Sequence, residues 1–387
     1  MNLFSKLKKD PKLMLVFDIG SSSVGGALFL VNEQGSPQII FSVREFIKLE
    51  DNIYFDKFLS STMKTLEIVA DKILKSRLGT PAKIFCVLSS PWYSSQIRNI
   101  SLKKNTPFVF SSKLGDELIK KEVNLFEEEN KKNGNDFCLI ELKNMRTVLN
   151  GYMTKKPLDQ KVKDIEMSVF ISMSQQDVLS SIRFTINNYF HQKDIQFSSF
   201  TLASFFVARD MVINQDNFTL VDVGGEITEL SLIKKDALCS SVSFPIGYNY
   251  FVRELASDLK CSLDEAKSYL SLYKDNHASE NAEKKLKPII EKLKLAWLAK
   301  FQESLVLLSN DIFVSSAIFM TADEELAVFF AETIKNEEFN QYAFTESKFK
   351  VVYLGTQMLH GIAEYRQDVK RDSFITIESI YIDRFLI

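Results

Sequence analysis

The alternation of hydrophobic and polar positions divides the chain into short strands and longer helices. Apolar runs rich in Val, Ile and Phe predict strands over residues 14–19, 24–31 and 38–43. Residues 56–78 carry apolar side chains at helical spacing and are expected to form an amphipathic helix, and "KIFCVLS" after them predicts a buried strand. Strands and helices that follow one another in this way indicate an α/β protein.

The pattern changes from about residue 90 to 172. Short alternating segments surround a charged helix, "GDELIKKEVNLFEEENKKNG", and a turn, "LNGY". We interpret this region as an inserted subdomain.

One local pattern occurs twice. "VFDIGSSSVGGALFLV" at 16–31 and "LVDVGGEITELSLIKK" at 220–235 each contain an apolar strand, an Asp-x-Gly turn and a second apolar strand. Such a turn exposes backbone N–H groups, and its small residues let an anion approach closely. The aspartate at the strand end can hold Mg²⁺ through water. Two such hairpins, one in each half of the chain, predict two related lobes that grip phosphate groups from both sides.

The second half of the chain shows mainly helical periodicity. Ser262 and Glu265 form a capping-box pattern that predicts a helix start. A long helix is expected over about 282–308, then a strand in "DIFVSSAIFMT" and a helix near 324–335. The segment "IESIYIDRFLI" is expected to be a packed terminal strand.

Composition excludes several classes of protein. The 387 residues contain 48 Lys and Arg against 50 Asp and Glu, a balance that gives no global attraction to nucleic acid. Four scattered cysteines without C-x-x-C spacing and three histidines do not indicate a structural metal site. Such cysteines suit a reducing cytosol. No apolar stretch reaches the roughly 20 residues needed to span a bilayer.

The paired turns carry a family resemblance. "DIGSSSV" at 18–24, "DVGGEITEL" at 222–230, "FPIGYNYFVRELASDL" after it, and "IFMTADEELAVFF" resemble the actin-like ATPase superfamily, and within it the bacterial FtsA and PilM branch. The resemblance covers about residues 14 to 335. It implies a two-lobed actin-like (ribonuclease-H-like, duplicated) ATPase fold, with a small α+β subdomain inserted in the first lobe.

The resemblance also implies a division of the chain. The expected parts are a basic flexible leader at 1–13, the first lobe at 14–89 and 173–215, the insert at 90–172, the second lobe at 216–350, and a C-terminal segment at 351–387 that returns to the first lobe.

ATP with magnesium is the cofactor that the resemblance implies. The residues that match the phosphate loops are Asp18, Gly20, Ser21, Ser22, Ser23, Asp222, Gly224 and Gly225, with Asp18 and Asp222 holding Mg²⁺ through water. The residues on the adenosine side are Lys267, Leu270, Thr321, Ala322 and Asp323. No catalytic residue is assigned.

Several of these positions depart from the family pattern. Glu226 replaces the third glycine of the second loop, and Glu229 replaces its closing aspartate. Ala322 and Asp323 replace a Gly-Gly pair, and the A-E-x-x-K helix motif is reduced to Ala266, Lys267 and Leu270. A carboxylate next to a triphosphate lowers affinity. We therefore expect weakened nucleotide binding, no efficient hydrolysis, and a fold kept as a scaffold.

The expected role is a scaffold at the cytoplasmic face of a bacterial inner membrane. An FtsA-like link between the division machinery and the membrane is placed narrowly first. The alternative is a PilM-like part of a type IV pilus or type II secretion platform, and a second alternative is an active ATPase. The partners are expected to be proteins of these machineries, without nucleic acid. Peripheral membrane contact and a homo-oligomer or filament are further expectations.

Overall fold

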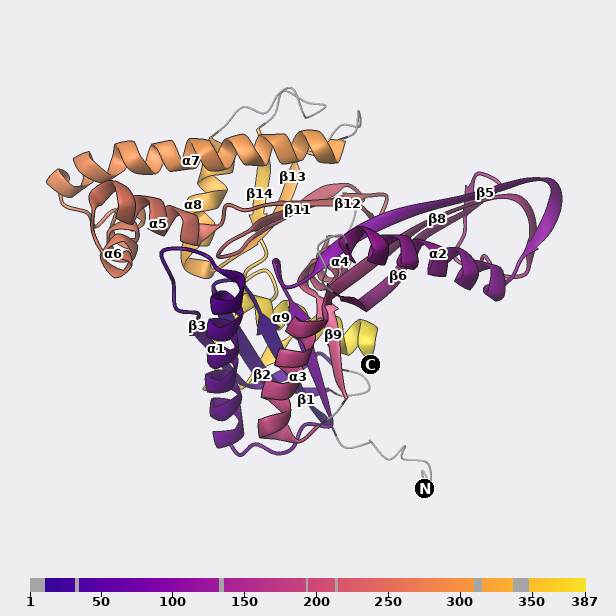
Figure 1. The fold of residues 1–387 in the computed structure, drawn as a ribbon, viewed down its shortest axis with the longest axis horizontal. Helices are drawn as coiled ribbons and strands as arrows, with labels where there is room; N and C mark the ends of the chain where they lie inside the picture. The colour runs from indigo at the N-terminus through magenta and orange to yellow at the C-terminus, as the bar shows by residue number, and fades with distance from the viewer. Residues whose placement is uncertain are drawn as a thin grey trace, which may run out of the picture.

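The structure is a computed structural model that describes residues 11–31, 35–131, 136–192, 194–212, 215–309, 315–336 and 348–387. Figure 1 shows two lobes, one below the other, and a third part that extends to one side. Most of the predicted leader, residues 1–10, lies outside the described residues.

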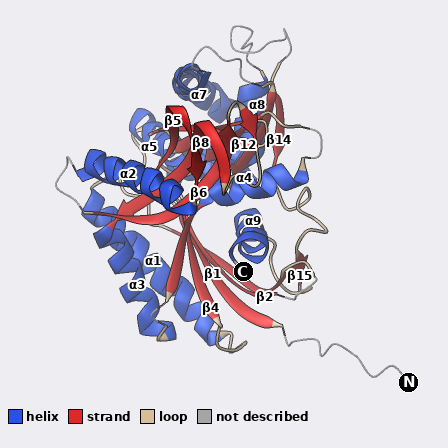
Figure 2. Cartoon of the chain, turned by 90° about the vertical axis from the view of Figure 1, so that its right-hand side faces the viewer, coloured by secondary structure: helices blue, strands red, loops and turns tan. Residues whose placement is uncertain are grey.

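The first lobe is built on a six-stranded sheet of order β15-β3-β2-β1-β4-β9. Its strands are β1 (Lys12–Ile19), β2 (Ser23–Val31), β3 (Gln38–Phe46), β4 (Lys83–Leu88), β9 (Ile195–Ser199) and β15 (Glu364–Tyr365). Helices α1 (Phe55–Lys75) and α3 (Gln176–Phe190) cover one face, and α4 (Phe200–Met211) and α9 (Ser373–Tyr381) lie on the other (Figure 2).

The second lobe is built on a five-stranded sheet of order β12-β11-β10-β13-β14. Its strands are β10 (Phe218–Val223), β11 (Thr228–Lys234), β12 (Ala237–Phe244), β13 (Ala317–Ala322) and β14 (Lys350–Tyr353). Its helices are α5 (Tyr248–Leu259), α6 (Leu263–Lys274), α7 (Glu280–Ser309) and α8 (Glu324–Lys335). The capping box of α6 is confirmed, because the Ser262 side chain accepts from the backbone N–H of Glu265.

The two sheets share one topology, which confirms the two related hairpins. In each lobe the first three strands pair antiparallel, and the first strand also pairs parallel with the strand on its other side. Asp18 and Asp222 occupy the same place, one residue before the end of β1 and of β10. Each lobe therefore presents its Asp-x-Gly turn at the same edge of its sheet.

The insert is a four-stranded antiparallel sheet of order β5-β8-β6-β7 with one helix. Its elements are β5 (Ser94–Phe110), α2 (Ser112–Lys131), β6 (Phe137–Leu149), β7 (Tyr152–Met153) and β8 (Gln160–Gln175). Glu141 of β6 fixes it to the first lobe. Its carboxylate accepts from the Ser198 hydroxyl, from the backbone N–H of Ser199 at 2.9 Å and from Tyr381 Oη at 2.9 Å.

The end of the chain is helical, so the expectation of a terminal strand is wrong. After β14 in the second sheet, the chain returns to the first lobe and forms α9, followed by a π-helical turn at Ile382–Leu386. Isoleucines 375, 377, 380 and 382 are all fully buried. Burial around most of the helix removes the polar stripe by which an amphipathic helix is recognised in a sequence.

Candidate functional site

The two Asp-x-Gly turns meet between the lobes. The backbone N–H of Glu226, in the second turn, donates to Ser21 Oγ in the first turn at 3.0 Å. A Cβ atom built at Gly225 would lie 2.7 Å from Ser22 Cβ and 2.8 Å from the Ser22 backbone nitrogen. The structure thus brings the predicted phosphate-loop residues together, but the two backbones are already in contact.

Several N–H groups of these turns are occupied by protein oxygens. Gly20 N–H donates to the Ser23 carbonyl at 3.1 Å, and Gly224 N–H donates to the Ile227 carbonyl at 3.0 Å. With the Glu226 N–H bound to Ser21, three groups that an anion would need are engaged within the chain.

The second turn also packs against the start of α5. Tyr248 and Asn249 donate their backbone N–H groups to the carbonyls of Gly224 and Gly225, at 3.1 and 2.8 Å. A Cβ atom at Gly247 would lie 2.4 Å from the Gly224 oxygen, so this position has no room for a side chain. The N-terminus of α5 is therefore satisfied by the turn itself.

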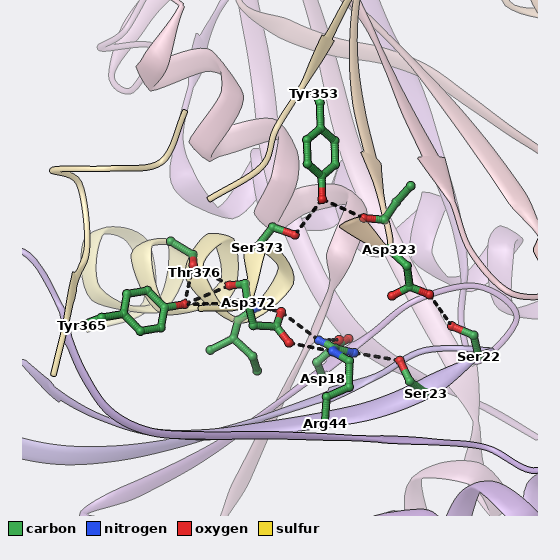
Figure 3. A network of polar contacts seen from close by, with 12 residues as sticks. Asp18, Ser22, Ser23, Arg44, Asp323, Tyr353, Tyr365, Asp372, Ser373 and Thr376 are labelled. Carbon is green, nitrogen blue, oxygen red and sulfur yellow. Dashed lines mark hydrogen bonds and ion pairs between the residues drawn. The ribbon is translucent and has the colours of Figure 1, made fainter. Parts of the chain in front are cut away.

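Asp18 is bound by an arginine that the sequence reading did not identify. Arg44 Nη2 lies 2.7 Å from Asp18 Oδ2 (Figure 3). The guanidinium also donates to Ser23 Oγ at 2.9 Å and to both carboxylate oxygens of Asp372, through Nε at 2.7 Å and Nη2 at 3.1 Å. The first-lobe aspartate predicted to serve magnesium is thus half of a buried ion pair.

The acidic side chains around Arg44 have pKa values that are shifted in opposite directions. Burial raises the pKa of Asp18, although Arg44 opposes this rise. Glu378 of α9 is fully buried next to Asp18, and burial together with the Asp18 charge holds its pKa well above the usual range. Burial also acts on Asp372, but attraction and hydrogen bonding from Arg44 outweigh it and lower the pKa. The cluster therefore places one arginine among three buried acidic side chains, those of Asp18, Asp372 and Glu378.

Asp222, the second predicted magnesium residue, binds inside its own lobe. Its Oδ1 accepts a hydrogen bond from Thr321 Oγ1 at 2.7 Å. Burial raises the pKa of Asp222 to about 8 despite this bond. Burial thus disfavours the ionised form of Asp222, which is the form that accepts best from magnesium-bound water.

The two glutamates that break the family pattern are paired with protein groups. Glu226 binds the Arg253 guanidinium, with Nη1 at 3.0 Å, and accepts from Asn249 Nδ2 at 2.8 Å. Glu229 accepts from four hydroxyl groups, those of Ser90, Tyr93, Thr201 and Ser241. Neither carboxylate is an unpaired charge facing an open phosphate site.

The adenosine-side residues are only partly brought together. Leu270 is buried in the core of the second lobe. Thr321 donates a hydrogen bond to Asp222. The Lys267 ammonium group lies over the Phe46 ring, 4.7 Å from its centre. Asp323 accepts a 3.4 Å hydrogen bond from Ser22 Oγ. The Ala322 carbonyl accepts from Tyr353 Oη at 3.2 Å.

A cavity of about 490 Å³ remains between the lobes on this side. Its lining is part apolar and part charged, with Phe46, Tyr248, Lys267, Asp323, Arg371 and Phe374 among its residues.

These residues, as they lie, do not fit a magnesium-bound polyphosphate. The two turns touch where the phosphates would pass, Arg44 takes the contact that a cation would make with Asp18, and Asp222 is bound to Thr321. Within the described ranges, no group of three or more His, Cys, Asp or Glu side chains is arranged to hold a metal ion. Of the residues predicted to bind phosphate, only Ser22 lines the cavity.

Sequence reasoning missed Arg44, Asp372 and Glu378. Only Gly25 could have pointed to this arrangement from the sequence. It lies between Asp18 and Arg44 in register across three strands, and a Cβ atom there would be 2.8 Å from Arg44 Nη2.

No protein-family model and no curated protein matches the chain. It is similar to a chain of the "PilM-PilN type IV pilus biogenesis complex", with 12% identity, 96% of each chain covered and a TM-score of 0.60.

Two other solved structures give lower scores. One is the ethanolamine utilization protein EutJ from Carboxydothermus hydrogenoformans, with 10% identity, 89% of this chain and 85% of that chain covered, and a TM-score of 0.44. The other is a Bacteroides thetaiotaomicron protein with actin-like ATPase fold, with 10% identity, 97% and 98% covered, and a TM-score of 0.40.

Sheet topology and the PilM comparison lead to the same fold. Two lobes repeat one strand order, their Asp-x-Gly hairpins face each other, and the overlap with the PilM-PilN structure includes nearly the whole chain. This agrees with the predicted FtsA and PilM branch. The protein therefore has the two-lobed actin-like ATPase fold.

Proposed function

We propose that this protein is a PilM-like assembly scaffold, which binds protein partners of a pilus or secretion platform. The observation that carries this proposal is the overlap with the chain from the PilM-PilN complex, which extends over 96% of both chains at 12% identity. An overlap of this extent includes the insert as well as the two lobes. The FtsA-like role, placed first from the sequence, becomes the alternative.

The contacts in the cleft support a scaffold rather than an ATPase. Hydrolysis needs a positioned phosphoryl group, a cation that neutralises its charge and a group that orients water. Here Arg44 binds Asp18, and the turns are in contact at Ser22 and Gly225. An active ATPase would require these contacts to open, so we place that role last.

The insert is the part best suited to a protein partner. Its strand β5 is an edge strand of the four-stranded sheet, and such strands can accept an added strand from another chain. Four large apolar side chains on the insert are more than half exposed: Val109, Tyr152, Met153 and Leu158. Exposed apolar groups of this kind are common at protein interfaces.

The proposed location is the cytoplasmic face of the inner membrane. Among the described helices, none has both the length and the apolar composition needed to cross a membrane. We propose peripheral attachment through a membrane-bound partner, and the net charge of -2 favours no nucleic-acid partner. A homo-oligomer or filament, expected from the resemblance to the FtsA and PilM branch, is kept as part of the proposal.

Affinity capture after crosslinking in the source cells tests this function. The bait is the full chain, compared with a Tyr152→Asp, Met153→Asp variant of the insert and with Phe184→Asp on α3, where the side chain is 71% exposed. Enrichment of pilus or secretion platform proteins that is lost only in the insert variant supports the proposal. Enrichment of a division polymer supports the FtsA-like role. Identical capture by all three baits contradicts partner binding through the insert.

A further inference from the structure

The carboxylate near the end of β1 is already neutralised by the sheet to which it belongs. Asp18 lies on β1 and Arg44 on β3, with Gly25 of β2 between them in register. Arg44 Nη2 is 2.7 Å from Asp18 Oδ2, and the two side chains are 15% and 3% exposed. A fixed cation at this distance supplies the neutralising charge that a bound metal ion would supply.

We infer that Arg44 is the resident cation of the cleft, and that the chain holds its two lobes closed without a nucleotide or a metal ion. This inference goes beyond the proposed scaffold function, because it concerns what controls closure and not which partner is bound.

Gly25 makes the contact feasible. A Cβ atom at this position would lie 2.8 Å from Nη2 and 3.0 Å from Cζ of Arg44. Gly25 is not among the glycines with positive φ, so its constraint is the space taken by the Arg44 guanidinium and not the backbone conformation. A side chain at position 25 would require the guanidinium to move from its present place beside Asp18.

A second carboxylate holds the guanidinium in place. Asp372 binds Arg44 through two hydrogen bonds, a geometry that fixes the plane of the guanidinium. Asp372 is itself fixed as the N-cap of α9, because its Oδ1 accepts from the backbone N–H of Ile375 at 3.1 Å. Arg44 is thus bound from both sides, and moving away from Asp18 would also disturb its two hydrogen bonds to Asp372.

Direct contacts between the lobes take the place of a bridging ligand. The second turn donates from Glu226 to Ser21, and its Gly225 packs against the Ser22 backbone. Deeper in the molecule, Glu229 of the second lobe accepts from Tyr93 and Thr201. These bonds join the lobes at the turns and behind them, so closure needs no phosphate group.

Hydrogen exchange measured by mass spectrometry on the full chain tests this inference. The wild type is compared without additions, with millimolar Mg²⁺, and with millimolar Mg²⁺ and ATP. We expect residues 18–26 and 222–230 to be protected to the same extent in all three conditions. Arg44→Gln and Gly25→Ala should each speed exchange in both segments at least tenfold, with α7 unaffected. Arg366→Gln is the control, because it removes the same charge from an exposed pair with Asp368.

Three results would overturn the inference. The first is slower exchange of both segments in the wild type when Mg²⁺ and ATP are added, because the lobes would then close on the nucleotide. The second is wild-type exchange in Arg44→Gln. The third is exchange at the wild-type rate in Gly25→Ala. This variant keeps every charge, so the wild type and Gly25→Ala still test the inference if Arg44→Gln does not fold.

Discussion

Glu229 is the clearest point at which to separate the two lobes experimentally. It lies on β11 of the second lobe and is only 7% exposed. Its carboxylate accepts from Ser90 Oγ at 2.8 Å, Tyr93 Oη at 3.0 Å and Thr201 Oγ1 at 2.6 Å, all outside the second lobe. The fourth donor, Ser241 at 2.9 Å, comes from the neighbouring strand. Replacing Glu229 by alanine removes every one of these bonds.

The cost follows from the number of donors left without an acceptor. Tyr93 and Thr201 keep their mutual hydrogen bond at 2.6 Å, and Ser241 keeps a 3.3 Å bond to the Leu230 carbonyl. The Ser90 hydroxyl and one hydroxyl of the Tyr93–Thr201 pair are then left without an acceptor, so we count two bonds as lost. At about 1.5–3 kcal/mol for each bond to a charged group, Glu229→Ala should lower the free energy of unfolding by about 3–6 kcal/mol. Glu229→Gln keeps an acceptor oxygen and should cost about half as much.

The two tryptophans provide the assay. Trp92 lies in the first lobe, where Nε1 donates to the Gly20 carbonyl, and Trp297 is buried in the second lobe against Thr228. Variants that retain one tryptophan, Trp92→Phe or Trp297→Phe, report the unfolding of one lobe each in urea. We expect coincident transitions in the parent chain and separate transitions once Glu229→Ala is added.

The reasoning is refuted if Glu229→Ala costs less than about 1 kcal/mol, or if the two fluorescence transitions stay coincident in its presence. Glu280→Ala is the control for loss of a carboxylate, because the Glu280 side chain is 84% exposed. It should shift neither transition by more than about 0.5 kcal/mol.

Three further predictions concern separate parts of the molecule. The raised pKa of Asp222, about 8, gives stability that is complete below the unfolded value near 4 and is lost as pH rises from there through 8. Asp222→Asn should therefore be more stable than the wild type by on the order of 5 kcal/mol at pH 8, with thermal unfolding showing no difference near pH 4. Glu141→Ala should free the insert from the first lobe and increase limited proteolysis at its borders, whereas the exposed Glu166→Ala should leave the cleavage rate unchanged; equal rates for both variants would contradict the role of Glu141. Gly247→Ala should destabilise by about 1–3 kcal/mol, because its Cβ would lie 2.4 Å from the Gly224 oxygen, and urea denaturation that matches the wild type would refute this packing.

The hairpins could be predicted from the sequence because they are local. Each places two strands and a turn within about twenty residues, so the apolar pattern and the Asp-x-Gly turn sufficed. The start of α6 was predicted for the same reason, since Ser262 and Glu265 satisfy each other within one turn.

The closed cleft could not be predicted, because its contacts join distant segments. Arg44 and Asp372 are 328 positions apart, and the 205 positions between Ser21 and Glu226 span both lobes. In the sequence Glu226 looked like a charge beside phosphate, but Arg253, on the helix after it, is its partner. Predicting that pairing requires knowing how α5 packs against the turn. Weakened ATP binding by the phosphate-loop residues stays a prediction.

The return of the chain to the first lobe sets the order in which the molecule can fold during synthesis. The core on one face of the first sheet contains Val16 from β1 together with Ile377 and Ile380 from α9. These residues are more than 350 positions apart, so this core cannot be completed until the ribosome has released α9. The insert, by contrast, is continuous between Ser94 and Gln175 and can pair its strands early. Until α9 arrives, α4 covers only part of this apolar sheet face, which makes this stage the one at which a chaperone has most to bind.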